Sequence, residues 1–458
     1  MKVWLVTIAL IGFSITRADT LVLDPEMAME LALENNTPLK VQGEKVGEAG
    51  AGKSAALGSL FPQISASGSY TRLGKVNEFE MITPVYGKFP LRVYDPKSGQ
   101  IIGFTDSIPL PIGADTLRLP LGSQNNYLFR ATVQQTLFTW GKLLNAYRLA
   151  GLSFDMQKAA YEQARQETKV QALEAFYRAL LTERTVRLLE ESYEQLRRHT
   201  EQVEKLYENG LASKLDLMRV KVSLTNMANS VNQMANNAEL ARAALCNLLG
   251  IPLDMAIVLK AELKPETVPF DSVGAVDSAL RRRPELMQLR RACQMADIGV
   301  RIARTANLPT LFAAANFDYK RPVGFSDRWD EDWNATVGVS WPLFSGLSNL
   351  NKLRQAQSRY RQALWSLKMV EEAVRLEVMA TFASLNQEKK NIDYQAENVQ
   401  LAEEAFRLAE ERYQNGLLTN LEFLDTQLQL TQSRVAYLSA LANYQVARAK
   451  FLRAIGDF

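Results

Sequence analysis

The sequence is poor in the residue types that most often carry catalysis or cross-links. Its 458 residues include one histidine, His199, and two cysteines, Cys246 and Cys293. One imidazole excludes H-E-x-x-H zinc sites, and two thiols are too few for a disulfide framework or a four-thiolate site. Either the two cysteines form a single disulfide, or both are free, buried thiols. No nucleophile elbow, P-loop or dinucleotide fingerprint occurs, so we predict no enzyme, no catalytic residue, no metal site and no cofactor.

The net charge is small, and long hydrophobic runs are scarce. The 53 basic and 50 acidic residues leave a net charge of +3, so there is no reason to expect a nucleic-acid partner. Lys2 precedes an apolar stretch over 3–15, and Thr16-Arg17-Ala18 provides a small-x-small cleavage site. These features predict a signal peptide over 1–18 and export from the cytoplasm. Beyond it no run of 18 apolar residues follows, which argues against a helical membrane span.

An internal repeat organises the rest of the chain. Residues 206–211 read LYENGL and residues 412–417 read RYQNGL, at an offset of about 206 residues. The same offset pairs Phe176 with Phe382. Two copies at this spacing indicate a duplication, since solenoid repeats have periods of only about 20 to 50 residues.

Each repeat contains one very long helical pattern. The predicted helices are 25–60, 141–208 and 213–249 in the first repeat, and 277–307, 347–414 and 419–455 in the second. The two longest are rich in Ala, Leu, Glu, Gln and Arg and lack proline, and each corresponds to a rod of roughly 100 Å. The repeats therefore cover 19–250 and 277–458, and a proline-containing connector over 251–276 is expected beside the rod.

Each repeat also contains two amphipathic strand patterns. The predicted strands are about 63–73, 127–138, 310–320 and 333–343. Their length and their single apolar face suit tilted transmembrane strands. A soluble sheet covered by helices is the alternative. Because lipid does not tolerate an open sheet edge, four membrane strands require several chains, and three chains are the simplest arrangement that leaves a conduit.

The connections between the strands differ in length. Residues 74–126 are rich in proline and glycine, so we expect a long irregular excursion that faces the exterior. The second connection, about 321–332, is short and contains Trp329, Asp330, Glu331 and Asp332. It is either a membrane-interface anchor with a cation-attracting rim or simply a solvated loop.

The combined pattern resembles the TolC family of outer-membrane channel proteins. The resemblance is carried by the duplicated helix–hairpin–long helix plan, Phe61-Pro62-Gln63 at the first hairpin, and the Tyr-x-x-Gly repeats at Tyr207 and Tyr413. It implies a mixed α and β membrane protein whose homotrimer forms a 12-stranded transmembrane β-barrel, continued by a long periplasmic α-helical barrel.

The resemblance also implies a function and partners. The chain would be the outer-membrane exit duct of a tripartite efflux or type I secretion system, conducting cargo passively. Its partners would be outer-membrane lipid, a periplasmic adaptor (membrane fusion) protein and, through the adaptor, an inner-membrane transporter of RND, ABC or MFS type. Drugs, metal ions and proteins all remain open as cargo. The alternative function is a periplasmic coiled-coil scaffold or adaptor with a soluble sheet.

The two helix turns carry the candidate site. Each turn has a glycine helix stop followed by a capping-box start, Ser-x-x-Asp or Thr-x-x-Glu. We predict that both turns lie at the periplasmic tip and dock the adaptor. The docking residues are Asn209, Gly210, Leu211, Asn415, Gly416 and Leu417.

The resemblance assigns an acidic entrance constriction to Glu422, Asp425 and Asp216, which three chains would turn into rings that favour cations. Alternatively, Glu422 and Asp216 only cap helices and Asp425 only meets water. The resemblance also suggests an entrance network with Tyr413 and Arg412. Leu418 stands where one family member has a latching arginine, which puts that latch in doubt.

Overall fold

The computed structural model describes residues 21–120, 122–265, 272–324 and 326–458. The expected signal peptide lies outside these residues. The chain forms two compact units. We call them the helical unit (residues up to 53, 148–300 and 354–458) and the strand unit (54–147 and 301–353).

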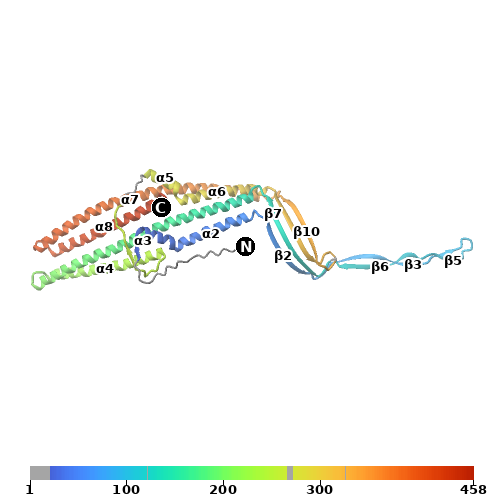
Figure 1. Ribbon diagram of the computed structural model, residues 1–458, viewed down its shortest axis with the longest axis horizontal. Coiled ribbons are helices and arrows are strands. Elements are labelled where there is room, and N and C mark those ends of the chain that lie inside the picture. Colours follow the sequence, from blue (N-terminus) through green and yellow to red (C-terminus); the bar gives the residue numbers. More distant parts are fainter. Residues whose placement is uncertain (1–20, 121, 266–271, 325) are drawn as a thin grey trace, which may run out of the picture. The chain divides into compact units, whose positions relative to one another are not determined.

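Two long helix hairpins dominate the helical unit (Figure 1). In the first, α3 (Lys142–Glu208) is followed by α4 (Lys214–Leu249). In the second, α7 (Ser348–Gln414) is followed by α8 (Asn420–Ala454). Both α3 and α7 have 67 residues, close to the expected ranges. Among the described residues, no helix combines the length and the apolar composition needed to cross a membrane.

The first helical pattern of each repeat is interrupted, so the single stretches expected at 25–60 and 277–307 are wrong. The helices are α1 (Pro25–Asn35), α2 (Thr37–Gly58), α5 (Ser272–Arg282) and α6 (Pro284–Arg304). At the first break the Asn36 side chain accepts a 3.1 Å hydrogen bond from the Leu39 backbone N–H, as a helix cap does. At the second break Pro284 begins α6, because a proline without an N–H suits a first turn.

Apolar side chains of both repeats form the core of the helical unit. One cluster contains Phe176, Leu245 and Leu249, and a second contains Val378 and Phe451. The two cysteines are free and buried, so the disulfide alternative is wrong. Burial raises the pKa of both thiols, which keeps them protonated.

Part of the connector is attached to the start of the chain by a short parallel ladder. Strand β1 (Leu21–Leu23) pairs with β8 (Ile257–Leu259). Leu23, Ile257 and Leu259 join the first core cluster. The connector residues 257–259 therefore pack against this core, although 266–271 lie outside the described residues.

The strand unit contains a four-stranded antiparallel sheet in the order β10-β9-β7-β2. The strands are β2 (Gln63–Arg72), β7 (Asn125–Phe138), β9 (Thr310–Arg321) and β10 (Asp330–Ser340). The two hairpins of the duplicated sequence meet where β7 pairs with β9. Strands β2 and β10 are the edges.

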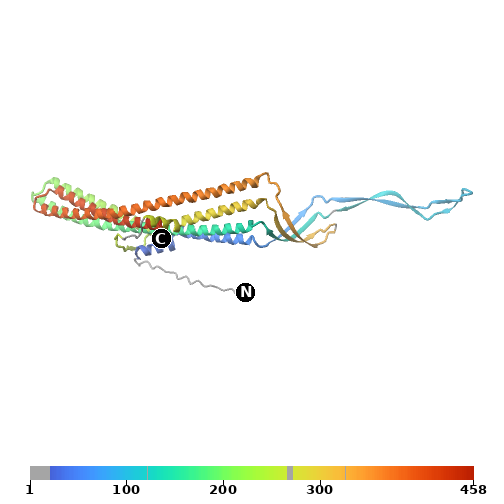
Figure 2. The ribbon, with the colours of Figure 1, turned by 90° about the horizontal axis from the view of Figure 1, so that it is seen from above.

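The expected irregular excursion over 74–126 is wrong, because much of it is a two-stranded ribbon. Strand β3 (Glu78–Phe89) pairs with β6 (Ile108–Pro120), and the short β4 (Arg92–Tyr94) pairs with β5 (Ile101–Phe104). The paired strands twist around each other (Figures 1 and 2). Prolines are tolerated here because each strand of a ribbon has one unpaired edge. Proline is therefore compatible with a ribbon as well as with a loop.

Candidate functional site

The first helix turn reverses the chain through hydrogen bonds between residues of the turn itself. Gly210 has φ +72°, its N–H donates to the Tyr207 carbonyl, and the Leu211 N–H donates to the Leu206 carbonyl. This pair of bonds is a Schellman motif, in which a left-handed residue favours glycine. Ser213 then caps α4 and accepts from the Asp216 N–H at 3.1 Å.

The second helix turn repeats this geometry. Gly416 has φ +70°, and the Leu417 N–H donates to the Arg412 carbonyl. Thr419 caps α8 in a full capping box with Glu422. The Asn209 and Asn415 side chains each donate to a carbonyl in the last turn of their helices, at 2.7 and 2.8 Å. Both chain reversals are therefore held by hydrogen bonds within the turns themselves.

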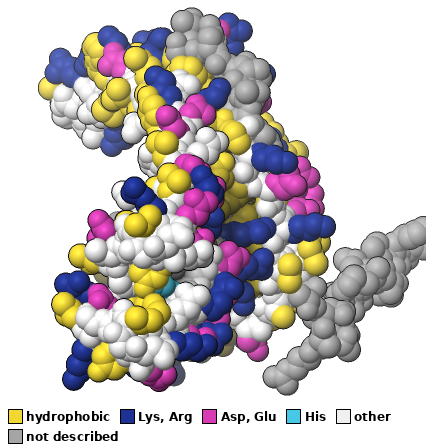
Figure 3. Space-filling model, turned by 90° about the vertical axis from the view of Figure 1, so that its left-hand side faces the viewer, with side chains coloured by type: hydrophobic (Ala, Val, Ile, Leu, Met, Phe, Trp, Pro, Cys, Tyr) yellow, Lys and Arg dark blue, Asp and Glu magenta, His cyan; other side chains and the backbone are white. Residues whose placement is uncertain are grey.

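Two leucine side chains at the turns are exposed and take no part in the hydrogen bonds that form the turns. Leu211 is 76% exposed and Leu417 is 73% exposed. Figure 3 looks onto the end of the helical unit where the hairpins turn, and shows basic, acidic and apolar side chains mixed over this surface. Exposed apolar groups at equivalent positions of both repeats suit a contact with another protein.

The predicted acidic residues have distinct local roles. The Glu422 carboxylate accepts from the Thr419 N–H at 3.0 Å and from its hydroxyl at 2.7 Å, so the capping role is present. These bonds, and the nearby positive charge of Arg412, hold the pKa of Glu422 below its usual value. Asp216 accepts from the Ser213 hydroxyl at 2.5 Å.

Asp425 is exposed one turn beyond the cap and lines a cavity of about 190 Å³ with side chains of α3 and α4. Within the described ranges, no three His, Cys, Asp or Glu side chains are grouped to hold a metal ion.

A larger cavity, of about 600 Å³, lies between the two turns of one chain. It is lined by Asp216, Tyr413 and Leu418, among other residues of both turns. Burial, and the negative charge of Asp216, raise the pKa of Tyr413. Tyr413 and Asp216, both predicted for the entrance, are thus brought together. Leu418, at the position where one family member has an arginine, adds an apolar side chain to the lining of this cavity.

Sequence reasoning missed a buried pair of polar side chains beside this cavity, His199 and Asn420. His199 Nε2 lies 2.8 Å from Asn420 Oδ1, and both residues are buried. The two residues are 221 positions apart, so no local pattern linked them. The one signal that the sequence offered was the scarcity of histidine, since His199 is the only one in the chain.

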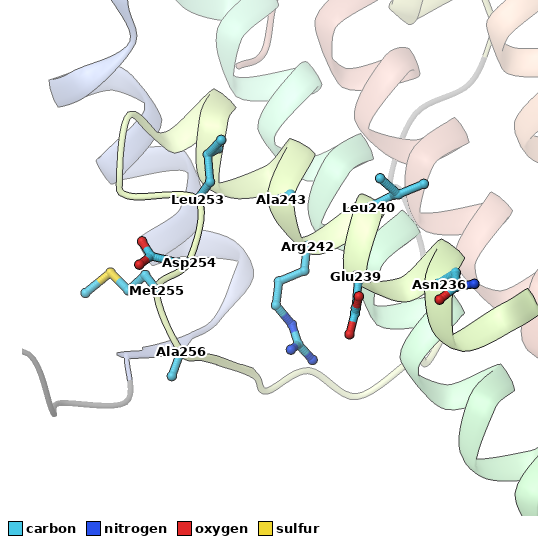
Figure 4. Close-up of a pocket in the computed structure, with 9 residues that line it drawn as sticks. All are labelled: Asn236, Glu239, Leu240, Arg242, Ala243, Leu253, Asp254, Met255 and Ala256. Carbon is cyan, nitrogen blue, oxygen red and sulfur yellow. The ribbon is translucent and has the colours of Figure 1, made fainter. Parts of the chain in front are cut away.

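A further cavity, of about 720 Å³, lies between α4 and the start of the connector. Glu239 and Arg242 extend from α4 toward the segment that carries Asp254, Met255 and Ala256 (Figure 4). Two acidic side chains, Glu239 and Asp254, and the basic Arg242 among mostly apolar neighbours do not form a catalytic arrangement.

In the strand unit, one face of the four-stranded sheet is polar and internally bonded. Arg130 forms a two-bond ion pair with Asp318, at 2.6 and 2.7 Å. Thr132 donates to Asn316 at 2.8 Å, and Asn316 donates to Asn334 at 3.0 Å. A ladder of polar contacts therefore crosses β7, β9 and β10.

The opposite face of the sheet is apolar and exposed. Ile64 is 77% exposed and Trp333 is 75% exposed. The other exposed apolar side chains of this face include Phe129, Val133, Phe317, Tyr319, Val337 and Val339. An apolar surface this extensive marks a contact with lipid or with another protein.

Comparison with known proteins gives this architecture a family. The family described as "Outer membrane efflux protein" matches residues 28–251 and 275–457. The chain is 23% identical over 437 residues to the probable efflux pump outer membrane protein TtgC of Pseudomonas putida, covering 94% of this chain and 82% of TtgC. It is 24% identical over 249 residues to the alkaline protease secretion protein AprF of Pseudomonas aeruginosa, covering 53% of this chain and 51% of AprF.

A solved structure shares the fold. The CmeC outer membrane channel of Campylobacter jejuni superposes with a TM-score of 0.76 at 18% identity, over 94% of this chain and 85% of that one. The long helices and strand hairpins are thus those of the TolC-like fold. Because the family match spans most of both repeats, the chain belongs to the outer membrane efflux proteins, a family of transport proteins and not of enzymes.

Proposed function

We propose that three copies of this chain form the outer-membrane exit duct of an export system that spans the periplasm. The duct conducts cargo passively. The observation that carries the proposal is the four-stranded sheet, which has one exposed apolar face, one bonded polar face and two open edges. The family match supports the outer membrane as its location.

The open edges support closure by several copies. In lipid, unpaired backbone groups along β2 and β10 would each cost several kcal/mol, roughly the cost of burying an unpaired polar group. Joining β2 of one chain to β10 of the next satisfies both edges. Two chains would give an eight-stranded barrel filled by side chains, whereas three give a twelve-stranded barrel wide enough for a lumen. The polar ladder that includes Arg130 and Asp318 then lines the lumen.

The helix turns are proposed as the contact with a periplasmic adaptor (membrane fusion) protein. The side chains of Leu211 and Leu417 are exposed, and hydrogen bonds within each turn hold the chain reversal without them, so both side chains are free to contact a partner. Through the adaptor, the duct would receive cargo from an inner-membrane transporter of RND, ABC or MFS type. An efflux pump is favoured over secretion, because the efflux relative matches 94% of this chain and the secretion relative 53%.

The acidic residues are proposed as the entrance constriction. Threefold symmetry would turn Glu422, Asp425 and Asp216 into rings of like charge, which favour cations. The capping role of Glu422 does not compete with this function, because its side chain remains exposed. Its lowered pKa keeps it charged at neutral pH.

Membrane fractionation followed by planar-bilayer recording tests the proposal. We expect the full chain to fractionate with the outer membrane, to need detergent for extraction and to form a conducting pore in a bilayer. The alternative, a periplasmic scaffold with a soluble sheet, predicts release with the periplasmic contents and no conductance. That outcome would overturn the proposed function.

A further inference from the structure

We propose that His199 is a positioning residue of the entrance, which acts through Asn420 to tie the second-repeat turn to the first-repeat turn of the same chain. The inference rests on the proposed function for its role in transport. Its structural part, the tie itself, can be tested separately. We call the two side chains the His199–Asn420 clasp.

The imidazole is held tightly on α3. His199 is 5% exposed, and its Nε2 lies 2.8 Å from the Asn420 side-chain oxygen. Its ring centroid lies 4.3 Å from that of Phe423 on α8 and 5.0 Å from that of Tyr413 on α7. Because the amide oxygen can only accept, His199 must donate from Nε2. This bond fixes the tautomer of the neutral ring.

Asn420 extends the contact to a third helix, α4. It is the first residue of α8 and is 7% exposed. Its side-chain amide donates to the Asp216 carbonyl on α4 at 3.3 Å. One side chain therefore joins α3, α4 and α8. Since Asn420 directly follows the Thr419 cap, fixing it also fixes the helix start that carries Glu422.

The other turn has no equivalent clasp. At the repeat offset of about 206, His199 corresponds to Ala405 and Asn420 to Lys214. The first-repeat turn reverses the chain with the same Schellman and capping geometry without these groups. The clasp is therefore not needed to make the turn. What it adds is a link between the two turns, which suits a control of the entrance.

The clasp is expected to weaken in acid. Burial lowers the pKa of His199 below its usual value of 6.5, while the hydrogen bond to Asn420 acts in the opposite direction. The charged or titratable side chains of the neighbouring cavity include Asp216 and Arg219 on α4 and Tyr413 on α7. Glu422 at the start of α8 and Arg412 on α7 interact with each other nearby. With a lowered pKa, the packed state binds fewer protons than the opened state, so its stability falls as the pH decreases below about 6.5. Neutral pH favours the closed clasp.

Hydrogen exchange of the full chain in detergent tests the clasp directly, on peptides that cover 205–216 and 411–422. At neutral pH we expect His199→Ala and Asn420→Ala to speed exchange in both peptides roughly tenfold, the effect of leaving one buried partner unpaired. His199→Gln should behave as the parent, because its side-chain amide can still donate to Asn420. Lys214→Ala, at the repeat counterpart of Asn420, is the matched control and should change neither peptide.

The pH profile separates positioning from simple packing. After correction for intrinsic exchange, lowering the pH to about 5.5, below the ordinary pKa of histidine, should loosen both turns in the parent but not in His199→Gln. Two results would overturn the inference. One is that the two peptides of His199→Ala exchange as slowly as those of the parent, and the other is that acid speeds exchange equally in the parent and in His199→Gln. If His199→Ala fails to fold, the second comparison decides alone.

Bilayer recordings of the same proteins connect the clasp to transport. We expect a larger mean conductance in His199→Ala than in the parent and in His199→Gln. If no protein conducts, the proposed function fails while the exchange data still judge the clasp. If the parent conducts and all variants match it, the clasp does not control the entrance and its role in transport is refuted.

Discussion

The two helix turns share one backbone design but differ in what surrounds it. Both end a 67-residue helix with a left-handed glycine, and both begin the next helix with a hydroxyl cap. Only the second-repeat turn has a buried amide, Asn420, followed by the aromatic Phe423 that packs on His199. Duplication thus supplied two equal chain reversals, and side-chain differences gave one of them a tie to the other.

The comparison explains why local geometry and function separate here. Hydrogen bonds inside each turn hold the chain reversal, so side chains at the surface are free to serve other purposes. Equal changes to the shared backbone should have equal effects in the two repeats. Changes to the side chains that differ should have unequal effects.

The largest expected effect comes from the exposed leucines. Replacing both Leu211 and Leu417 with Asp should abolish export, because a charge in an apolar docking surface is left unpaired when the partner binds. The oligomer and its membrane insertion should persist, since neither side chain supports the turn. Export in a deletion strain, with cross-linking to the adaptor, measures the effect.

Leu253→Asp provides the control for the docking prediction. Leu253 is also exposed but belongs to the connector. The Leu253→Asp variant should therefore export as well as the parent. An adaptor that cross-links only to the strand unit, or full export by the double variant, would show that the turns are not the docking surface.

The entrance charges should have the next largest effect. The double change Glu422→Gln with Asp425→Asn should reduce cation preference and weaken block by multivalent cations in bilayer recordings. The helix start should remain, because Gln can occupy the third position of a capping box. Asp216→Asn sharpens the comparison by removing the corresponding first-repeat charge. Unchanged selectivity in a preserved oligomer would remove these residues from the site.

The glycines should show the equality of the two turns. Gly210→Ala and Gly416→Ala should each destabilise their hairpins by about 1 kcal/mol, the cost of a left-handed conformation for a residue with a side chain. No atom lies within 4 Å of an added Cβ at either position, so steric overlap adds nothing. Exchange rates of the adjacent helix ends would measure both costs. A clear difference between the two would refute the equivalence.

The smallest effect should be the acid response of the second cap. The Thr419 hydrogen bonds lower the pKa of Glu422, so its contribution is complete above the ordinary value near 4.5 and is lost as the pH falls through the lowered pKa. Exchange at the start of α8 should therefore rise in acid, and Glu422→Gln should not show this rise. An identical acid response in that variant would contradict the assignment.

Much of the fold could be predicted because its signals are local and repeated. The proline-free composition located α3 and α7, and polar–apolar alternation located the four sheet strands. The Gly and Thr-x-x-Glu patterns predicted the second turn, and the capping box is confirmed. Each of these features depends on neighbours within a few residues.

The features that could not be predicted depend on distant partners or on permissive backbone. The ribbon over 74–126 was missed because proline in an unpaired strand edge gives the same sequence signal as a loop. At Asn36 the cap on the Leu39 N–H is local, but the bond that the same side chain donates to the Leu248 carbonyl, 212 residues away, could not be predicted. His199 was noted only as a scarce residue, since the partner that gives it a role lies on α8.

The mass of the detergent-extracted particle tests the central claim most directly. The chain is 51.4 kDa before any processing, and light scattering corrected for bound detergent gives the protein mass alone. Our account predicts a particle of three chains, because four strands with two open edges can close around a lumen only with further copies. A folded particle with the mass of one chain would contradict it.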